Sequence, residues 1–430
     1  MYPYVLNDVT IHYFGEKGIA VNHKDGNHYF LNKNELILLE KCNGNNSIDD
    51  IVQETAKEIQ LFDISRVHNT ISKFINFQMQ RNLIGLNEIS YYIPIHFTGK
   101  KGYEIPMEIL LEITNRCNLK CIHCYKEAGY DKKDDIDIKK LLTKLEYFKG
   151  HIHSLQISGG EPMSHRYFFD ILDYCTRNFS TSLTTTATMI NKHNAHRFID
   201  VDNVQVSVYA ATPEEHDKIT LVPGSFHRTM RGIQELVHKE NNVTISSIIT
   251  MENYMVLEDI IRLAVDMGVQ AIKFGEFSRY GRGENLGEEW ELAKDIDTYV
   301  TNRISELATK YKDRINVENY YDDLLEMKFD YNHKGFSCGA GNLSWTISEF
   351  GNIKPCVFLP ENRFKTGNIF EDDMDVLFKK NHILNLHTNI VEWEHSLNDQ
   401  NMSSKQICPV MKNYEEFFDN QLWKTDGVKQ

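Results

Sequence analysis

The sequence contains no run of apolar residues long enough to cross a membrane. A spanning helix needs about 20 consecutive, mainly apolar residues, and no stretch of the 430 residues approaches that length. Residues 1–10 also lack the basic segment followed by an apolar run that marks a secretory signal peptide. We therefore expect a cytoplasmic protein that does not use a membrane as its partner.

Positive charge is in the minority in this chain. There are 47 Lys and Arg residues against 61 Asp and Glu residues, which gives a formal net charge of −14. A nucleic-acid-binding surface needs clustered Lys and Arg, so we expect no nucleic-acid partner. Low-complexity stretches are absent as well, and hydrophobic residues make up 41% of the chain. This composition favours globular folding, and the length predicts two or three domains.

The first region, residues 1–99, has the pattern expected of a winged helix. Three strand-like runs precede three amphipathic helical segments, and the strands are expected at 9–13, 18–22 and 28–31. Asn32 and Ser47 are suited to cap the first two helices. The third helix is expected over residues 65–80. A small sheet with three helices suggests a winged helix.

The second region, residues 104–320, alternates strand and helix patterns. Six strands are expected, at 109–113, 155–158, 182–186, 204–209, 245–250 and 271–277, with amphipathic segments between them. This alternation predicts an α/β fold with a parallel sheet, either open or curled into a partial (β/α)6 TIM-like barrel. In such folds, functional residues lie in loops at the C-terminal ends of the strands. The basic loop at 279–283 could meet substrate or simply be exposed.

The chain has only eight cysteines. In a cytosolic protein of this size they are better explained as metal ligands or buried thiols than as disulfides. Cys42 and Cys175 lie on expected helices among apolar neighbours, so core packing is the better interpretation. Three others, Cys117, Cys121 and Cys124, follow the first strand of the second region.

The spacing of this triplet bears on three kinds of site. A structural zinc site normally uses four protein ligands, often as two separated pairs, and no fourth cysteine is nearby. A redox Cys-x-x-Cys pair would leave Cys117 without a role. A four-iron cluster with three cysteine ligands leaves one iron open for a substrate. The spacing and the position in the first βα loop favour the cluster.

A Cys-x3-Cys-x2-Cys spacing after the first strand of a βα series resembles the signature of the radical S-adenosylmethionine (SAM) superfamily. The resemblance implies that the open iron binds SAM, and that one electron cleaves SAM to a 5′-deoxyadenosyl radical. The run Gly159-Gly160-Glu161-Pro162 after the second strand is similar to the Gly-Gly-Glu-Pro motif of that family. The family often has Asn-Gly after the third strand. Thr186-Ala187 replaces it here, and we assign that pair no role.

The same resemblance implies which residues contact SAM. Gly159 and Gly160 would let the backbone approach the ligand, and the Glu161 carboxylate would accept hydrogen bonds from its ammonium group. His123 takes the position of an aromatic ring near the adenine, although a solvated loop residue is the alternative. Ser207, in the fourth strand, would lie near the ribose or the carboxylate.

A second set of cysteines, Cys338, Cys356 and Cys408, lies in the last region. A hairpin with its turn at Gly351 would bring Cys338 and Cys356 together. The pattern resembles the opening of a SPASM domain or its shorter twitch relative, which implies an auxiliary iron–sulfur cluster with an unknown fourth ligand. No further cysteine lies between Cys356 and Cys408, unlike in a full SPASM domain. The alternative is that these thiols are buried small hydrophobic groups.

The first region resembles the PqqD-like domains that recognise the leader segment of a precursor peptide. Such domains add the leader as a strand to a sheet edge, and residues 28–31 are the candidate edge. A DNA-binding winged helix is disfavoured by the acidic charge and by the fused enzyme. A domain used only for assembly or stability is the other alternative.

Together the parts resemble subtilosin-type sactipeptide maturases of the radical SAM/SPASM (twitch-like) family. The resemblance implies a PqqD-like domain at 1–99, a radical SAM core at 104–320 and a SPASM/twitch-like domain at 321–430. It implies an oxidoreductase that forms thioether links from a cysteine sulfur to an α-carbon in a ribosomally synthesised precursor peptide. The cofactors would be a [4Fe-4S] cluster, SAM and an auxiliary cluster, with a reductant such as flavodoxin or ferredoxin. Epimerisation, another cross-link, small-molecule chemistry and a non-catalytic iron–sulfur protein are the alternatives.

Overall fold

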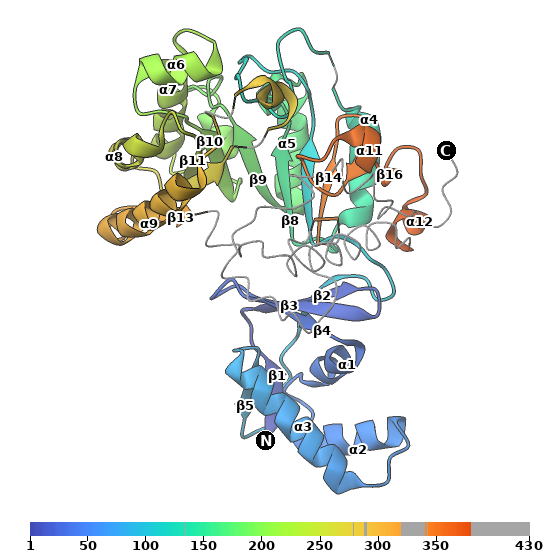
Figure 1. The fold of residues 1–430 in the computed structure, drawn as a ribbon. Helices are drawn as coiled ribbons and strands as arrows, with labels where there is room; N and C mark the ends of the chain where they lie inside the picture. The colour runs from blue at the N-terminus through green and yellow to red at the C-terminus, as the bar shows by residue number, and fades with distance from the viewer. Residues whose placement is uncertain (134, 278, 288–289, 320–339, 342, 380–430) are drawn as a thin grey trace. The chain divides into compact units, whose positions relative to one another are not determined.

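The computed structural model describes residues 1–133, 135–277, 279–287, 290–319, 340–341 and 343–379 (Figure 1). The chain divides into two compact units, of which the first contains Met1–Met107 with two short later segments. The second contains most of the remaining chain and holds the large sheet. No helix in the described part of the chain combines the length and the apolar character needed to cross a bilayer.

The first unit has a four-stranded sheet in the order β4-β3-β2-β6 and a separate antiparallel pair, β1 with β5. Neighbouring strands β2, β3 and β4 are antiparallel, and β6 runs parallel to β2. The strands are β1 (Tyr2–Val5), β2 (Val9–Phe14), β3 (Lys17–Asn22), β4 (His28–Leu31), β5 (Ile84–Asn87) and β6 (His96–Gly99). The helices are α1 (Lys33–Lys41), α2 (Ile48–Glu58), α3 (Ile64–Gln80) and α12 (Met374–Lys379). The sequence predicted β2 to β4 and the first three helices.

The starts of α1 and α2 are fixed by side chains that bind free backbone N–H groups. Asn32 accepts hydrogen bonds from two of them, and Glu35 binds back to the Asn32 N–H. Ser47 and Asp50 form the same reciprocal arrangement at α2. Each such cap contributes on the order of 1 kcal/mol. The apolar faces of these helices then pack into one core, which includes Cys42 at 1% exposure.

The second unit has a ten-stranded sheet in the order β13-β12-β11-β10-β9-β8-β7-β14-β15-β16. Every neighbouring pair from β13 to β14 is parallel, and β15 runs antiparallel to both of its neighbours, β14 and β16. The predicted strands appear as β7 (Glu108–Glu112), β8 (Ser154–Ser158), β9 (Ser180–Thr185), β10 (Asn203–Ser207), β11 (Val243–Ile249) and β12 (Ala271–Glu276). The α/β parallel sheet is therefore confirmed. The remaining strands are β13 (Asn316–Asn319), β14 (Ser344–Ile347), β15 (Asn352–Lys354) and β16 (Gly367–Asn368).

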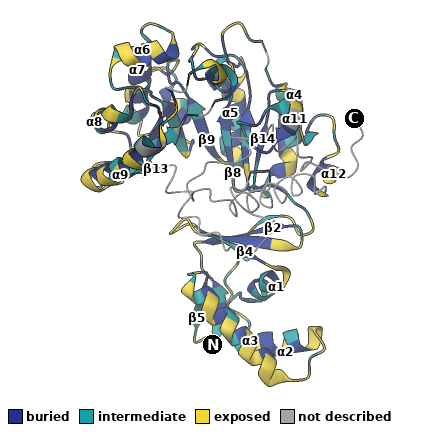
Figure 2. Cartoon of the chain, viewed as in Figure 1, coloured by how far each residue is buried: buried dark blue, intermediate teal, exposed yellow. Residues whose placement is uncertain are grey.

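Helices connect the parallel strands, and Figure 2 shows buried strands with exposed outer faces on the helices. These helices are α4 (Ile138–Leu145), α5 (Phe168–Asn178), α6 (Pro213–Thr220), α7 (Ser225–His238), α8 (Leu257–Met267) and α9 (Lys294–Tyr311). The short α11 (Glu361–Phe364) lies, in chain order, between the antiparallel strands β15 and β16. Central strand residues such as Leu111, Ile157 and Leu183 are fully buried. The sheet thus forms the core and presents the ends of its strands to the loops that carry function. Cys175 on α5 is also fully buried, as expected for a packing residue.

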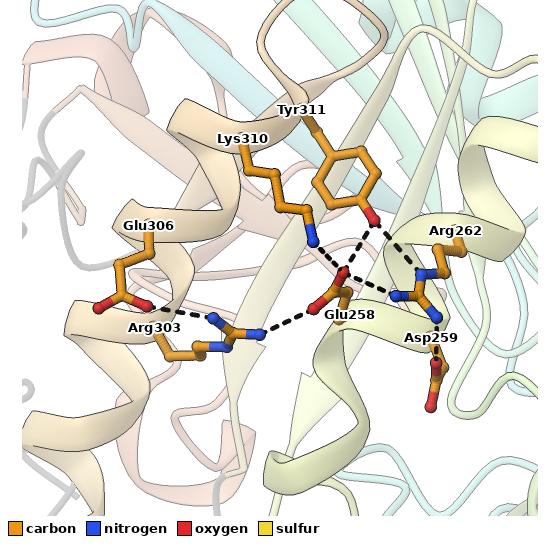
Figure 3. Close-up of polar contacts among 7 residues, drawn as sticks. All are labelled: Glu258, Asp259, Arg262, Arg303, Glu306, Lys310 and Tyr311. Atoms are coloured by element: carbon orange, nitrogen blue, oxygen red, sulfur yellow. Dashed lines mark hydrogen bonds and ion pairs between the residues drawn. The ribbon is translucent and has the colours of Figure 1, made fainter.

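Glu258 at the start of α8 ties that helix to α9 (Figure 3). Its carboxylate accepts hydrogen bonds from Lys310 at 2.6 Å, Arg303 at 2.8 Å, Arg262 at 2.9 Å and Tyr311 at 3.0 Å. The bonds from Lys310 and Tyr311 contribute most to lowering the pKa of Glu258 to about 2.

We expect Glu258→Gln to lower the midpoint of thermal unfolding at neutral pH by roughly 1–3 °C, because exposed ion pairs stabilise weakly. The folded-state pKa lies below the ordinary value of 4.5. The stabilisation is therefore present above pH 4.5 and is lost as the pH falls toward 2. Thermal unfolding followed from neutral pH to about pH 3 should show the two proteins converging. Glu306→Gln is the control, because Glu306 binds Arg303 alone from an exposed position; a variant difference that grows on acidification would contradict the assignment.

Candidate functional site

The three clustered cysteines lie together in the loop that follows β7, here called the cysteine loop (residues 114–129). Cys117 and Cys121 are buried and pack with Leu119 and Ala128, and Cys124 is partly buried against them. None of the three forms a disulfide. Burial raises the pKa of Cys121 to about 12 and that of Cys117 further, and the neighbouring thiols add to both shifts. Without a bound metal ion, the Cys117 and Cys121 thiols would therefore stay protonated at neutral pH.

The Gly-Gly-Glu motif after β8 holds the cysteine loop in place. The Gly160 N–H donates to Thr114 O at 2.8 Å, and the Glu161 N–H donates to Arg116 O at 2.7 Å. Gly159 has φ +138°, and a Cβ at that position would lie 2.5 Å from Thr114 O. A Cβ on Gly160 would collide with Arg116 O. The two glycines therefore let this motif pack against the cysteine loop, and their approach to SAM stays a prediction.

The Glu161 carboxylate is fully buried and accepts hydrogen bonds from four donor groups of its own chain. Thr186 gives two of them at 2.7 Å, one from its backbone and one from its hydroxyl. Thr185 binds both oxygens, and the Met163 N–H completes the set. The pair Thr186-Ala187, to which we assigned no role, thus begins with a residue that orients Glu161. A contact from Glu161 to the SAM ammonium group stays a prediction.

Tyr209 joins two of the expected SAM residues to the cysteines. Its hydroxyl lies close enough to the Cys121 thiol and to the Ser207 side chain to interact with both. The His123 ring meets the Tyr209 ring edge-on, with 4.6 Å between the ring centroids. Because His123 is only 7% exposed, the solvated-loop interpretation is wrong. Burial, with a smaller effect of Arg282, lowers the pKa of His123 to about 4, so the ring is neutral at neutral pH. Nothing in the sequence pattern singled out Tyr209.

The second cysteine set is described at one position only. Cys356, after β15, is partly buried and interacts with Tyr125, which directly follows Cys124. The Tyr125 ring packs edge-on against Phe358, with centroids 5.3 Å apart. Cys338 and Cys408 lie outside the described residues, so the auxiliary site stays a prediction. Cys356 nevertheless lies near the residue next to the third cysteine of the loop.

A group of buried charges connects the cysteine loop to the β14–β15 hairpin. Lys126 lies 3.1 Å from Glu112 at the end of β7 and 2.6 Å from Glu349 in the hairpin turn. Lys354 lies 3.6 Å from Glu112. None of these four side chains is more than 10% exposed. Sequence reasoning missed this group because 223 positions separate Lys126 from Glu349.

The donor set fits an iron–sulfur cluster. Among the described residues, no three His, Cys, Asp or Glu side chains are placed to hold a single metal ion. Three thiols that each bind a different iron of one cluster need not converge on one point. They lie in the first loop at the C-terminal end of the parallel strands, where cofactors of such folds bind. This arrangement suits a cluster with one open iron better than a four-ligand zinc site.

Residues 111–265 match the model of the radical SAM superfamily. The chain is 24% identical over 393 residues to the antilisterial bacteriocin subtilosin biosynthesis protein AlbA of Bacillus subtilis (strain 168), covering 88% of this chain and 84% of that protein. It is 21% identical over 285 residues to the sporulation killing factor maturation protein SkfB of the same strain, covering 65% and 67%.

Solved structures share the fold over nearly the whole chain. Streptococcus suis SuiB bound to S-adenosylmethionine aligns with a TM-score of 0.63 at 16% identity, covering 90% of each chain. The same protein bound to precursor peptide SuiA aligns with a TM-score of 0.59 at 17% identity, covering 89% of each chain. These likenesses agree with the α/β fold that the alternating pattern predicted.

Proposed function

We propose that this chain, which carries a radical SAM domain at residues 111–265, modifies a ribosomally synthesised precursor peptide. The observation that carries the proposal is the gathering of Cys117, Cys121 and Cys124 in the loop after β7. The backbone of Gly160 and Glu161 fastens that loop from the next strand. The cysteines thus lie in a loop at the C-terminal end of the parallel strands, where a cofactor-binding cluster is expected.

In this proposal the three cysteines hold a [4Fe-4S] cluster that supplies the electron for cleaving SAM. Gly159, Gly160, Glu161, Ser207 and His123 line the SAM site. Thr185 and Thr186 keep the Glu161 carboxylate oriented by hydrogen bonds, so that it can meet the ammonium group without reorganisation. His123 presents a neutral ring, which suits contact with an adenine face.

The peptide substrate is supported by the names and structures of relatives. AlbA is a bacteriocin biosynthesis protein, SkfB is a maturation protein, and SuiB binds a precursor peptide. We propose a thioether link between a cysteine sulfur and an α-carbon. The α-carbon gives one hydrogen atom to the deoxyadenosyl group of cleaved SAM, the thiol releases a proton, and the new carbon–sulfur bond releases one electron to an acceptor. An auxiliary cluster on Cys338, Cys356 and Cys408 is the candidate acceptor.

The leader of the precursor is proposed to bind the first unit at β4. Within the described residues β4 pairs only with β3, so its other edge can take an added strand. Arg81 lies over the rings of Tyr29 on β4 and Phe77 on α3, at 5.0 and 4.0 Å from their centroids. These side chains form a surface beside the edge that mixes aromatic and cationic character.

We also propose three domains, at residues 1–99, 104–320 and 321–430. A cytoplasmic flavodoxin or ferredoxin is the proposed reductant.

The test begins with iron-loaded, dithionite-reduced protein under anaerobic conditions. We expect it to cleave SAM to 5′-deoxyadenosine and methionine. Synthetic copies of short cysteine-containing peptides encoded beside its gene supply the substrates, followed by mass spectrometry. A thioether link appears as the loss of two hydrogens from a peptide, with one 5′-deoxyadenosine formed for each link.

Two other results would change the conclusion. If the mass of the peptide is unchanged in water but the peptide gains deuterium when the reaction runs in D2O, the reaction is an epimerisation. Iron-loaded protein that leaves SAM intact would refute the radical SAM activity and favour a non-catalytic iron–sulfur protein.

A further inference from the structure

Arg282, in the loop after β12, is bound directly to the cysteine loop. Its guanidinium donates from Nε to Cys121 O at 2.8 Å and from Nη1 to Ala128 O at 2.8 Å. Its backbone N–H donates to Cys124 O at 3.0 Å. One residue therefore holds carbonyl groups at two cysteines and at the end of the loop.

Gly281 makes this close approach possible. Its φ is +55°, a conformation that side chains rarely adopt, and it lies against the backbone of Cys124 and Tyr125. A Cβ at this position would lie 2.7 Å from Cys124 O and would collide with Tyr125 O. Packing against the cysteine loop therefore requires glycine at position 281, whereas a solvent-exposed loop would tolerate a side chain there.

The charge of Arg282 has no carboxylate partner in the described residues, whose ion pairs do not include it. Its guanidinium is partly buried and binds neutral carbonyl oxygens. By contrast, Arg279 in the same loop pairs with Glu291 at 3.0 Å. Arg282 therefore places a partly buried positive charge, without a carboxylate partner in the described part of the chain, beside the cysteines. The same charge acts on Cys121 and His123.

We propose that Arg282 is a positioning residue that fixes the shape of the cysteine loop and keeps a positive charge beside its three thiolates. The inference rests on the cluster site of the proposed function. A reduced cluster bound by three thiolates carries one more negative charge than the oxidised cluster. A fixed positive charge nearby therefore stabilises the reduced form more than the oxidised form. Net charge and hydrogen bonding around the sulfurs set the reduction potential of such clusters. Arg282 thus favours the reduced state that cleaves SAM.

The first test uses metal-free protein and compares Arg282→Gln and Arg282→Lys with Arg279→Gln. Amide hydrogen exchange over residues 117–129 should become about tenfold faster in both Arg282 variants, because the carbonyl bonds are lost or weakened. Arg279→Gln removes a charge from the same loop without touching the cysteine loop, so exchange there should not change. Unchanged exchange in both Arg282 variants would overturn the positioning role.

The second test uses reconstituted protein and measures the midpoint potential of the cluster by EPR-monitored titration. At a fixed applied potential, the ratio of reduced to oxidised cluster should fall about tenfold in Arg282→Gln, which is about 59 mV for one electron. Arg282→Lys keeps the charge and should stay closer to wild type. An equal fall in Arg279→Gln, or an unchanged potential with a raised KM for peptide, would overturn the proposal. If wild type itself binds no cluster, the proposed function fails, and the exchange experiment alone still decides the role of Arg282.

Discussion

Replacing Cys117, Cys121 and Cys124 together with alanine is expected to abolish SAM cleavage and to remove about four irons per chain. The three thiols are the only cysteines that the structure describes in the loops after β7 to β12, and they pack in one group. Without them no open iron remains to bind SAM. Iron and sulfide counts, together with 5′-deoxyadenosine formation under anaerobic conditions, measure both parts of the prediction.

The single variants Cys42→Ala and Cys175→Ala are the matched controls. Both thiols are buried, at 1% and 0% exposure; Cys42 belongs to the apolar core of the first unit, and Cys175 lies on α5. They should keep the iron content and SAM cleavage of wild type. Retained SAM cleavage in the triple variant would refute the assignment of the cluster ligands.

The same iron count tests whether the C-terminal region of the chain binds an auxiliary cluster. If the triple variant keeps about four irons while wild type holds about eight, an auxiliary cluster exists and Cys338, Cys356 and Cys408 are its candidate ligands. If the triple variant holds none, those cysteines have a structural role. The protein would then hold only the SAM-binding cluster, and the identity of the substrate would be open again.

The elements that the sequence predicted are those specified by local patterns. Strands β7 to β12 alternate with amphipathic helices, and the first residues of α1 and α2 carry capping boxes that need only four neighbouring positions. The cysteine spacing is local as well, which is why the sequence was enough to group Cys117, Cys121 and Cys124. Gly159 to Glu161 were recognised in the same way, as a contiguous motif.

The features that escaped prediction depend on contacts between distant parts of the chain. Strand β14 pairs in parallel with β7, with Trp345 opposite Ile109, and no local pattern encodes such a register. Thr186 orients Glu161 across two strands, and Arg282 reaches the cysteine loop from a segment 161 positions beyond Cys121. The basic loop at 279–283 could not be assigned to substrate contact or to simple exposure from its sequence, because its contacts are defined only by the fold.

Lys126→Met is expected to destabilise the second unit by about 3–5 kcal/mol, since it removes the shared cation of two buried carboxylates. Glu112 is fully buried and the Glu349 side chain is 4% exposed, and among the described residues Lys354, at 3.6 Å, would be the cation that remains beside Glu112. Burial raises the pKa of both carboxyls, and at Glu112 the two lysines outweigh it and hold the pKa below its usual value. The loss should loosen the attachment of the cysteine loop to the hairpin.

The sign of the pH dependence distinguishes this cause from a loss of packing. In Lys126→Met the two carboxyls would have raised folded-state pKa values, so the penalty is largest at neutral pH and shrinks as the pH falls toward the ordinary value of 4.5. Adding Glu349→Gln to Lys126→Met should recover part of the stability, because one unpaired charge is removed. Lys218→Met is the control, since Lys218 pairs with Glu252 at 3.3 Å and is 71% exposed. Thermal unfolding across this pH range makes the comparison. If Lys126→Met costs as little as Lys218→Met, the charges near the cysteine loop are solvated, and the loop is held by the Gly160 and Arg282 contacts instead.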